Sequence, residues 1–316
     1  MNHLILYVGI PGSGKTTHAE ETARLLREDG RNVRIFSSDA IREEIYGDAN
    51  IVGNAGEVFG LMENRLFAHF TNDPDSVAIY DATNLTVKGR KGLLDRIRRK
   101  FVCYFECRFV ACRISECKRR QFSRDRKVPD YVIERMVRQF QAPFYNEGWD
   151  EITIVEGGPL YNLTEEHSDS WDIPHDNPHH ARTIGSHMAA ARREALVLAG
   201  DYDDSAVIAA YNHDIGKPHT KGFANAKGEP TEDAHYYGHE SVSAYMYLSS
   251  QHDHKFDSIK ILTGALIQWH MMPYFITPRG ETPKKEDLAQ WCSKHGFAED
   301  FIDKLWIVHQ ADQGAH

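Results

Sequence analysis

The feature that most constrains the fold is the octapeptide at residues 9–16. Its sequence, Gly9-Ile10-Pro11-Gly12-Ser13-Gly14-Lys15-Thr16, matches G-x-x-x-x-G-K-[ST] at every position. An apolar run (LILYV, 4–8) precedes it, and a helical pattern (16–29) follows. This context predicts a phosphate-binding loop in which Lys15 neutralises the β and γ phosphates of ATP and Thr16 binds Mg²⁺. The predicted nucleotide-binding residues are Gly12, Ser13, Gly14, Lys15, Thr16 and Thr17.

The hydrophobic pattern predicts two domains. Up to residue 157, strand-like runs alternate with helical segments, which is typical of an α/β fold with a parallel sheet and helices on both faces. Residues 158–181 contain three prolines and show no periodicity, so we expect a linker there. From 182 to 316 the periodicity is helical, which predicts an all-α domain.

Composition and charge limit the partners and the cellular compartment that we expect for this chain. The net charge of −9 argues against a generic nucleic-acid-binding protein, although residues 88–127 carry 15 Lys or Arg against four acids. That segment is either a docking site for a polyanion or a solvated helix face. We find neither an apolar run long enough for a membrane span nor an export signal. We therefore expect a cytoplasmic protein with reduced cysteines and no membrane partner, and the oligomeric state, a homo-oligomer included, stays open.

Candidate catalytic residues follow the second and third predicted strands. Asp39 lies at the carboxyl edge of the sheet, where it can take a proton from an attacking hydroxyl, or it can cap the next helix. Arg42 follows one helical turn later and can hold a phosphate beside that hydroxyl. Asp81, in IYDATNL, can support the magnesium ion or the acceptor, and Asn84 either assists it or forms a turn.

A basic helix supplies candidate lid residues. Arg120 and Arg124 are four apart in CKRRQFSRDRKVP and therefore share a helix face, which suits a lid over the triphosphate. Arg119 and Arg126 are alternatives for this role.

These segments together resemble the 5′-hydroxyl polynucleotide kinase family. The resemblance covers about residues 1–155 and is carried by GIPGSGKTT, SSDAIR, YDATNL and RRQFSR. It implies that Asp39 is the general base and that Arg42 grips the phosphate 3′ of the acceptor hydroxyl. It also implies lid roles for Arg120 and Arg124.

Histidines and aspartates mark the C-terminal domain. Each lies in or beside a predicted helix, so the side chains can gather in a bundle core as metal ligands. The candidates are His187, His213, Asp214, His239, His270 and Asp312. A metal-bound hydroxide is a nucleophile at neutral pH, and two metals can clamp a phosphoester.

The strings NHDIGKPHT, AHYYGHESVSA, LIQWH and IVHQAD resemble the HD-domain phosphohydrolases. The resemblance implies that His187, His213, Asp214 and Asp312 bind a metal and that His239 and His270 complete a two-metal site. A divalent transition metal such as Mn²⁺, Ni²⁺ or Co²⁺ is expected there. Lys217 is a candidate contact to the scissile phosphate.

The two halves together predict a bifunctional RNA end-healing enzyme. A kinase for 5′-hydroxyl ends and a phosphohydrolase for 2′,3′-cyclic phosphate or 3′-phosphate ends would prepare RNA or DNA breaks for a ligase. One alternative is a small-molecule kinase joined to a nucleotide phosphohydrolase, which the acidity favours. The other is a toxin-like kinase or a regulatory nucleotide-binding module.

Overall fold

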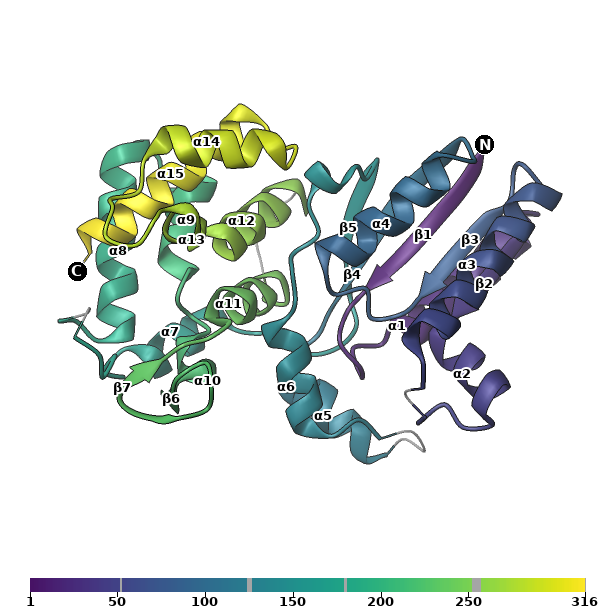
Figure 1. The fold of residues 1–316 in the computed structure, drawn as a ribbon, viewed down its shortest axis with the longest axis horizontal. Helices are drawn as coiled ribbons and strands as arrows, with labels where there is room; N and C mark the ends of the chain where they lie inside the picture. Colours follow the sequence, from purple (N-terminus) through teal and green to yellow (C-terminus); the bar gives the residue numbers. More distant parts are fainter. Residues whose placement is uncertain (52, 124–126, 179–180, 252–256, 316) are drawn as a thin grey trace. The chain divides into compact units, whose positions relative to one another are not determined.

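The chain forms two compact units in a computed structural model (Figure 1). The structure describes residues 1–315 except 52, 124–126, 179–180 and 252–256. Unit 1 comprises residues 1–136 and 147–160, and unit 2 comprises residues 137–146 and 161–316. Among the described helices, none is both long enough and apolar enough to cross a membrane.

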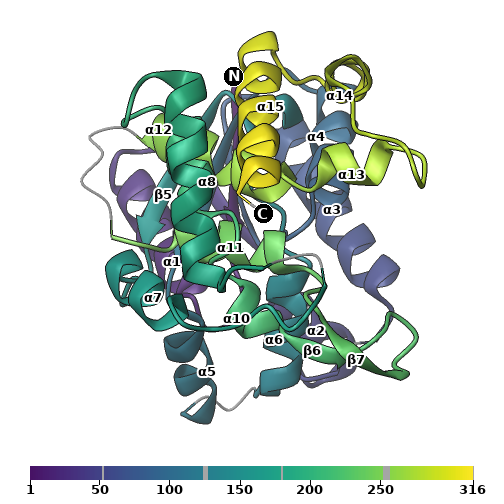
Figure 2. The ribbon, with the colours of Figure 1, turned by 90° about the vertical axis from the view of Figure 1, so that its left-hand side faces the viewer.

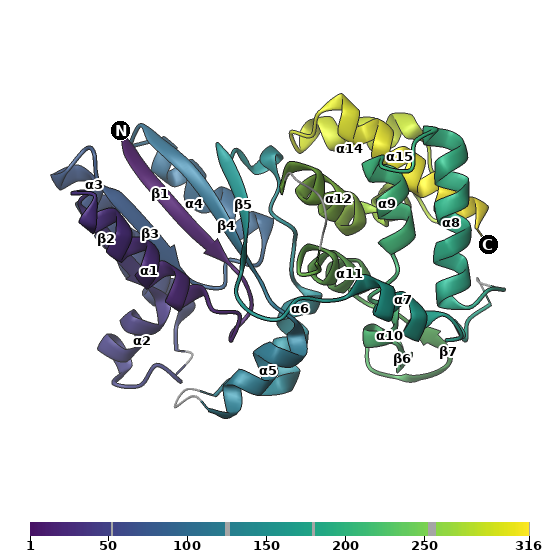
Figure 3. The same ribbon diagram turned by 180° about the vertical axis from the view of Figure 1, so that it is seen from behind.

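Unit 1 is built on a five-stranded parallel sheet. Its order is β2-β3-β1-β4-β5, and Figure 3 shows β1 between β3 and β4. The strands are β1 (Asn2–Val8), β2 (Val33–Ser37), β3 (Val77–Asp81), β4 (Cys103–Ala111) and β5 (Glu151–Glu156). Residues 4–8 are fully buried, as expected for a central strand covered on both faces. The predicted α/β fold is confirmed.

Helices cover both faces of this sheet. Ile5 and Tyr7 of β1 pack against Ala19 and Ala23 of α1 in one core, and the buried sides of α3 and α4 cover the other face (Figures 1 and 3). The helices are α1 (Lys15–Glu28), α2 (Ser38–Tyr46), α3 (Ala55–Asn72), α4 (Val87–Arg98), α5 (Ile114–Phe122), α6 (Asp130–Arg138) and the 3₁₀ helix η1 (Tyr145–Glu147).

The strand register assembles one edge of the sheet. Asp81 at the end of β3 is level with Tyr7 of β1 and Ser37 of β2. The chain leaves all three strands at this edge, where ligands bind in such sheets. The glycine-rich loop and α2 therefore begin beside each other.

Unit 2 is mainly helical. Its helices are α7 (Leu163–Ser170), α8 (Ile184–Ala199), α9 (Ser205–Asn212), α10 (Lys217–Thr220), α11 (His239–Leu248), α12 (Asp257–Trp269), α13 (Met272–Ile276), α14 (Lys285–Lys294) and α15 (Glu299–Gly314). Alanines such as Ala191, Ala210 and Ala311 fill the core between α8, α9 and α15. Small side chains let helix axes approach closely. Figure 2 shows α8 and α15 side by side.

Unit 2 differs from the all-helical prediction in one respect. Residues 216–236 interrupt the helical periodicity and are predicted to form a loop, but they contain an antiparallel hairpin, β6 (Gly222–Ala224) and β7 (Pro230–His235). Its turn is held by the Asn225 side chain, which accepts from the amides of residues 227 and 229, and by Gly228 with φ of 83°. The strands lack the apolar alternation that would have revealed them. Helix α7 also lies inside the predicted linker, 158–181.

Candidate active sites

The loop between β1 and α1 has the conformation that its glycines permit. Gly12 and Gly14 have φ values of 86° and 106°. A Cβ on Gly12 would lie 2.5 Å from the carbonyl oxygen of Cys117, so a larger residue would displace the loop. Lys15 is 8% exposed, and its Nζ donates to the carbonyl of Ile10 at 2.9 Å. The ammonium group therefore lies within the loop that can cradle phosphates.

Thr16 and Asp81 form a pair suited to Mg²⁺. Thr16 Oγ1 donates to Asp81 Oδ2 at 2.9 Å. Burial raises the pKa of Asp81, while Lys15 and the Thr16 hydroxyl act in the opposite direction. A Thr hydroxyl beside a carboxylate at a strand end is the usual magnesium-holding pair of P-loop enzymes. Of the other predicted loop residues, Ser13 is buried, and neither it nor Thr17 lines the pocket here.

Asp39 and Arg42 line the same pocket as Lys15 and Asp81. Arg42 Nη1 donates to Asp39 Oδ1 at 3.1 Å. The N-cap of α2 is Ser37, and Asp39 lies within the first helical turn, so the capping alternative does not hold. The carboxylate is about half exposed and can meet an incoming hydroxyl.

Asn84 is a turn residue. Its φ is 49°, a conformation that asparagine tolerates better than most residues. Its Nδ2 donates to the carbonyl of Tyr7 at 2.8 Å and to that of Ala82 at 3.3 Å. The side chain therefore joins the turn after β3 to β1, and the turn-forming alternative is the one that the structure shows.

Arg120 of α5 contacts the loop directly. Its Nη1 donates to the carbonyls of Gly12 at 3.1 Å and Gly157 at 2.8 Å, and its Nε donates to Glu116 at 2.7 Å. Arg119 also bonds Glu116, but its side chain is 71% exposed. Arg124 and Arg126 lie outside the described residues.

Sequence reasoning missed Gln121 in this pocket. The side chain is 4% exposed, and its Oε1 accepts from the amide of Val128 at 3.2 Å. Its Nε2 has no hydrogen-bond partner among the described residues. The sequence signal that could have revealed it is its position directly after the candidate lid residue Arg120. A buried glutamine amide is costly unless it bonds to a ligand or to another residue.

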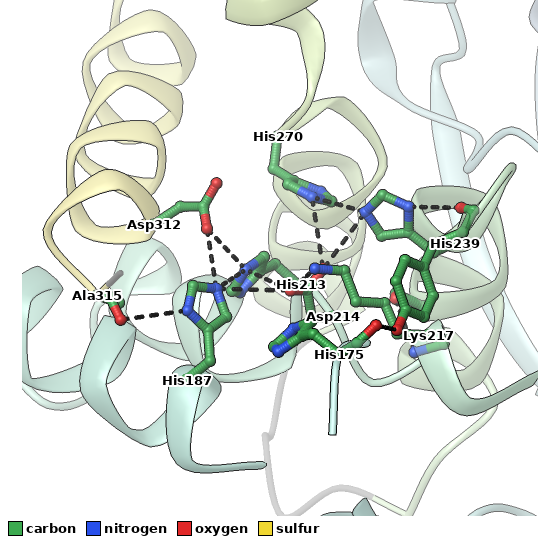
Figure 4. A network of polar contacts seen from close by, with 12 residues as sticks. His175, His187, His213, Asp214, Lys217, His239, His270, Asp312 and Ala315 are labelled. Atoms are coloured by element: carbon green, nitrogen blue, oxygen red, sulfur yellow. Dashed lines mark hydrogen bonds and ion pairs between the residues drawn. The ribbon is translucent and has the colours of Figure 1, made fainter. Parts of the chain in front are cut away.

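Two overlapping groups of side chains meet in the core of unit 2 (Figure 4). Cluster A consists of His187, His213, Asp214 and Asp312. Its contacts run from 3.0 Å, between His187 Nε2 and Asp312 Oδ1, to 3.5 Å, between His187 Nε2 and Asp214 Oδ2. His187 comes from α8, His213 and Asp214 follow α9, and Asp312 comes from α15. All four are nearly or fully buried.

Cluster B consists of Asp214, His239 and His270. His239 Nε2 lies 3.3 Å from both Asp214 Oδ1 and His270 Nε2, and His270 Nε2 lies 3.9 Å from Asp214 Oδ1. Asp214 thus presents Oδ2 to cluster A and Oδ1 to cluster B. Neither oxygen has a well-oriented hydrogen bond among the described residues.

The imidazoles have the tautomer of metal ligands. Each Nδ1 lies against a backbone carbonyl, which can only accept: Ala315 for His187, Ala210 for His213, Tyr236 for His239 and Ile267 for His270. The Nε2 atoms point into the clusters, an arrangement that orients ligating histidines. Burial opposes the charged form of His213, but Asp214 and Asp312 outweigh it and raise its pKa to about 10, so His213 must release its Nε2 proton to bind a metal. Burial and the neighbouring histidines lower the pKa of His270 to about 3, so this ring is neutral.

The spacing of these atoms fits one cation in each cluster. Ligands about 2.1 Å from a metal lie roughly 3.0–3.4 Å apart in octahedral or tetrahedral geometry. The contacts of cluster A span 3.0–3.5 Å, and two of the three in cluster B are 3.3 Å. The buried Asp214 carboxylate needs positive charge beside it; Lys217 and His213 supply it in this structure, and a divalent cation among the ligands would supply it more directly. The six predicted ligands are brought together and can hold two divalent ions.

Lys217 and His175 lie next to the clusters. Lys217 Nζ is 2.7 Å from Asp214 Oδ2 and lies over the Tyr236 ring. His175 was not found by sequence reasoning. It is buried, and its ring packs edge-on against that of His187. It lies in the segment predicted as a linker, where nothing in the pattern separated it from solvent-exposed histidines.

The basic segment 88–127 is not a continuous charged surface. Much of its charge lies in ion pairs, and Arg90 is fully buried against Glu147. Other ion pairs among the described residues of the segment are Arg96–Glu63, Arg98–Asp95, Arg108–Glu106, Lys118–Glu134 and those of Arg119 and Arg120 with Glu116.

Comparison with known proteins agrees with the fold of unit 1. Residues 4–143 match the family model described as AAA domain. Solved structures with low similarity include Kti12 of Chaetomium thermophilum in complex with ADP-AlF3 (19% identity, TM-score 0.39, covering 48% of this chain and 88% of that one). A gluconokinase of Sinorhizobium meliloti 1021 (15%, 0.34, 52% and 86%) and the APS kinase CysC of Mycobacterium tuberculosis with AMPPNP and APS (17%, 0.34, 53% and 94%) are similar to comparable extents. With its glycine-rich loop, strand order and Thr16–Asp81 pair, unit 1 has the features of a P-loop nucleotide-binding domain.

Proposed function

We propose that this chain is a bifunctional RNA end-healing enzyme. Unit 1 would phosphorylate 5′-hydroxyl ends with ATP. Unit 2 would act as an HD-type phosphohydrolase on 2′,3′-cyclic phosphate and 3′(2′)-phosphate ends of RNA or DNA. The observation that carries the proposal is that Asp39 and Arg42 line one pocket with Lys15, Thr16 and Asp81. In the proposal, Asp39 is the proton acceptor and Arg42 the phosphate-binding group beside the nucleotide loop.

In the kinase reaction, Asp39 accepts the proton of the 5′-hydroxyl as its oxygen bonds to the γ-phosphorus and the bond to ADP breaks. Arg42 exchanges its contact with Asp39 for the phosphate 3′ of that hydroxyl, which orients the acceptor. Lys15 and Arg120 neutralise charge on the transferred group. Mg²⁺ held by Thr16 and Asp81 would shield the phosphates.

In unit 2, the chain offers a bridging carboxylate and neutral imidazoles to two ions. Mn²⁺, Ni²⁺ or Co²⁺ at clusters A and B would polarise a phosphoester and supply a nucleophile at neutral pH. Lys217, next to Asp214, is positioned to contact a phosphate oxygen. The reaction would yield a 3′-hydroxyl, which with a 5′-phosphate is a substrate for a ligase. A cytoplasmic location is part of the proposal, and it is compatible with the five cysteines, none of which forms a disulfide among the described residues.

A second candidate is a small-molecule or toxin-like kinase joined to a nucleotide phosphohydrolase. Ion pairs neutralise several basic side chains in residues 88–127. They favour this second candidate, because they reduce the basic surface available to a polynucleotide.

End-labelling separates the candidates. RNA and DNA strands with a 5′-hydroxyl and a 2′,3′-cyclic phosphate are incubated with γ-labelled ATP, Mg²⁺ and Mn²⁺, and nucleosides compete as acceptors. We expect label at the 5′ end and loss of the cyclic phosphate. Asp39→Ala should stop only labelling, and Asp214→Ala should stop only hydrolysis. Transfer to nucleosides with none to strands would refute the end-healing proposal.

A further inference from the structure

A cavity opens beside the clusters of unit 2. Its volume is about 920 Å³, within the range of sites for small organic ligands. Asp214, His239 and His270 line it together with Lys217. One part of the cavity can therefore receive a phosphate group. A phosphate alone would leave most of this volume unfilled.

The remaining wall is largely aromatic. Tyr236, Tyr237, Tyr274 and Phe275 contribute to it. Tyr237 is 50% exposed and Phe275 is 65% exposed, so both rings are open to water. A single exposed aromatic residue needs no explanation, but two on the wall of one cavity mark a surface that a ligand covers.

Two rings of this wall are parallel. The His235 and Tyr237 rings stack with centroids 5.3 Å apart and planes 7° apart. The Tyr236 hydroxyl donates to the carbonyl of His175. The Lys217 ammonium lies 5.3 Å from the centroid of the Tyr236 ring. The part of the cavity that contains Lys217 and the candidate metal ligands thus adjoins the aromatic part.

We infer that this aromatic wall stacks the base of the nucleotide whose phosphate lies at Lys217 and the clusters. The inference rests on the proposed hydrolase and names its substrate as a nucleotide phosphate with an unpaired base. Bases stack on aromatic side chains whatever their identity, so we expect tolerance of sequence. A base in a duplex is already stacked and paired, so a single-stranded end is preferred over a blunt one.

The test is equilibrium binding to the full-length protein. The probe is a 5′-fluorescein hexanucleotide with a 3′-phosphate, measured with Mn²⁺ present and read before hydrolysis proceeds. A second probe lacks only the base of the last nucleotide. We expect the abasic probe to bind roughly 5- to 50-fold more weakly. Tyr237→Ala and Phe275→Ala should weaken the complete probe similarly, with little effect on the abasic one, and Tyr237→Phe should restore binding. Tyr202→Ala, at an exposed ring outside the cavity, is the control.

Equal binding of the two probes to the wild-type protein would overturn the inference. So would an equal loss for both probes in Tyr237→Ala, because the ring would then support the pocket without contacting the base. Hydrolysis of both probes with Mn²⁺ in either case would leave the proposed function standing, whereas hydrolysis of neither would refute that function. A nucleoside 3′-phosphate as third probe identifies the source: tighter binding of the hexanucleotide points to a strand end, and equal binding points to a free nucleotide.

Discussion

The Arg90–Glu147 ion pair should be among the largest single contributors to the stability of unit 1. Arg90 Nε and Nη2 donate to the two Glu147 oxygens at 2.7 and 2.6 Å, and both side chains have 0% exposure. Arg90 Nη1 also donates to the carbonyl of Asn84 at 2.9 Å, which fixes the turn after Asp81. Removal of one partner would leave the other charge buried without its two-bond ion pair.

We expect Arg90→Met to lower the free energy of unfolding of unit 1 by about 3–5 kcal/mol, and Glu147→Met to have a similar effect. The double variant should lose much less than the sum, because two apolar side chains of similar volume can replace a buried pair at little net cost. Total stabilities are about 5–15 kcal/mol, so the single variants should be near the limit of folding.

Arg96 and Glu63 offer a matched control. They form the same two-bond geometry, at 2.7 and 2.6 Å, but their side chains are 45% and 17% exposed. Water already screens this pair, so Arg96→Met should cost less than about 1 kcal/mol.

Urea titration read by hydrogen exchange of peptides from β1 and β4 reports unit 1 separately from unit 2. Equal losses in Arg90→Met and Arg96→Met would show that burial does not set the cost. A double variant as unstable as the sum of its singles would show that the two charges do not depend on each other. Either result refutes the reasoning.

Four further results are expected. Lys15→Ala should abolish phosphate transfer and leave hydrolysis intact, as measured by the end-labelling assay. Gly12→Ala should weaken ATP binding by on the order of tenfold or more in calorimetry, because its Cβ would meet the Cys117 carbonyl; unchanged affinity would contradict this. Mn²⁺ at 100 times its dissociation constant should raise the melting temperature of unit 2 by roughly 5–10 °C, and Asp214→Ala should remove that rise. Burial lowers the pKa of His167 to about 4, so its neutral form stabilises unit 2 above pH 6.5. The free energy of unfolding of unit 2 should fall by about 3 kcal/mol as the pH falls through 4, and His167→Gln should flatten that pH dependence in urea titrations.

Local patterns predicted most elements of both units. The sequence pattern predicts a strand at 77–81 (VAIYD) and a helix at 184–199, and the structure shows both with these bounds. Both have clear local signals, a short apolar run in one case and a helical period ended by Gly200 in the other. The β6–β7 hairpin was missed because its strands are short and polar, and its turn chemistry is the only local sign.

Site residues were predictable where they lie next to one another in the sequence. The loop 9–16 needs its glycines, lysine and threonine in sequence, so the order alone reveals it. Gln121 and His175 were missed because their residue types are common on surfaces, and only packing shows that both are buried. The six candidate metal ligands come from segments as far apart as His187 and Asp312, and their spacing cannot be read from the sequence.

The sequence by itself determined the phosphate-binding loop, the parallel sheet and the helical character of the second half, because these depend on neighbouring residues. Only the tertiary structure decided where charges lie. Arg90 counts among the 15 basic residues of 88–127, yet it is buried against Glu147, and Asp214 has one oxygen in each of two clusters. Burial and distance across the fold set these outcomes, and both arise from contacts between segments remote in the chain.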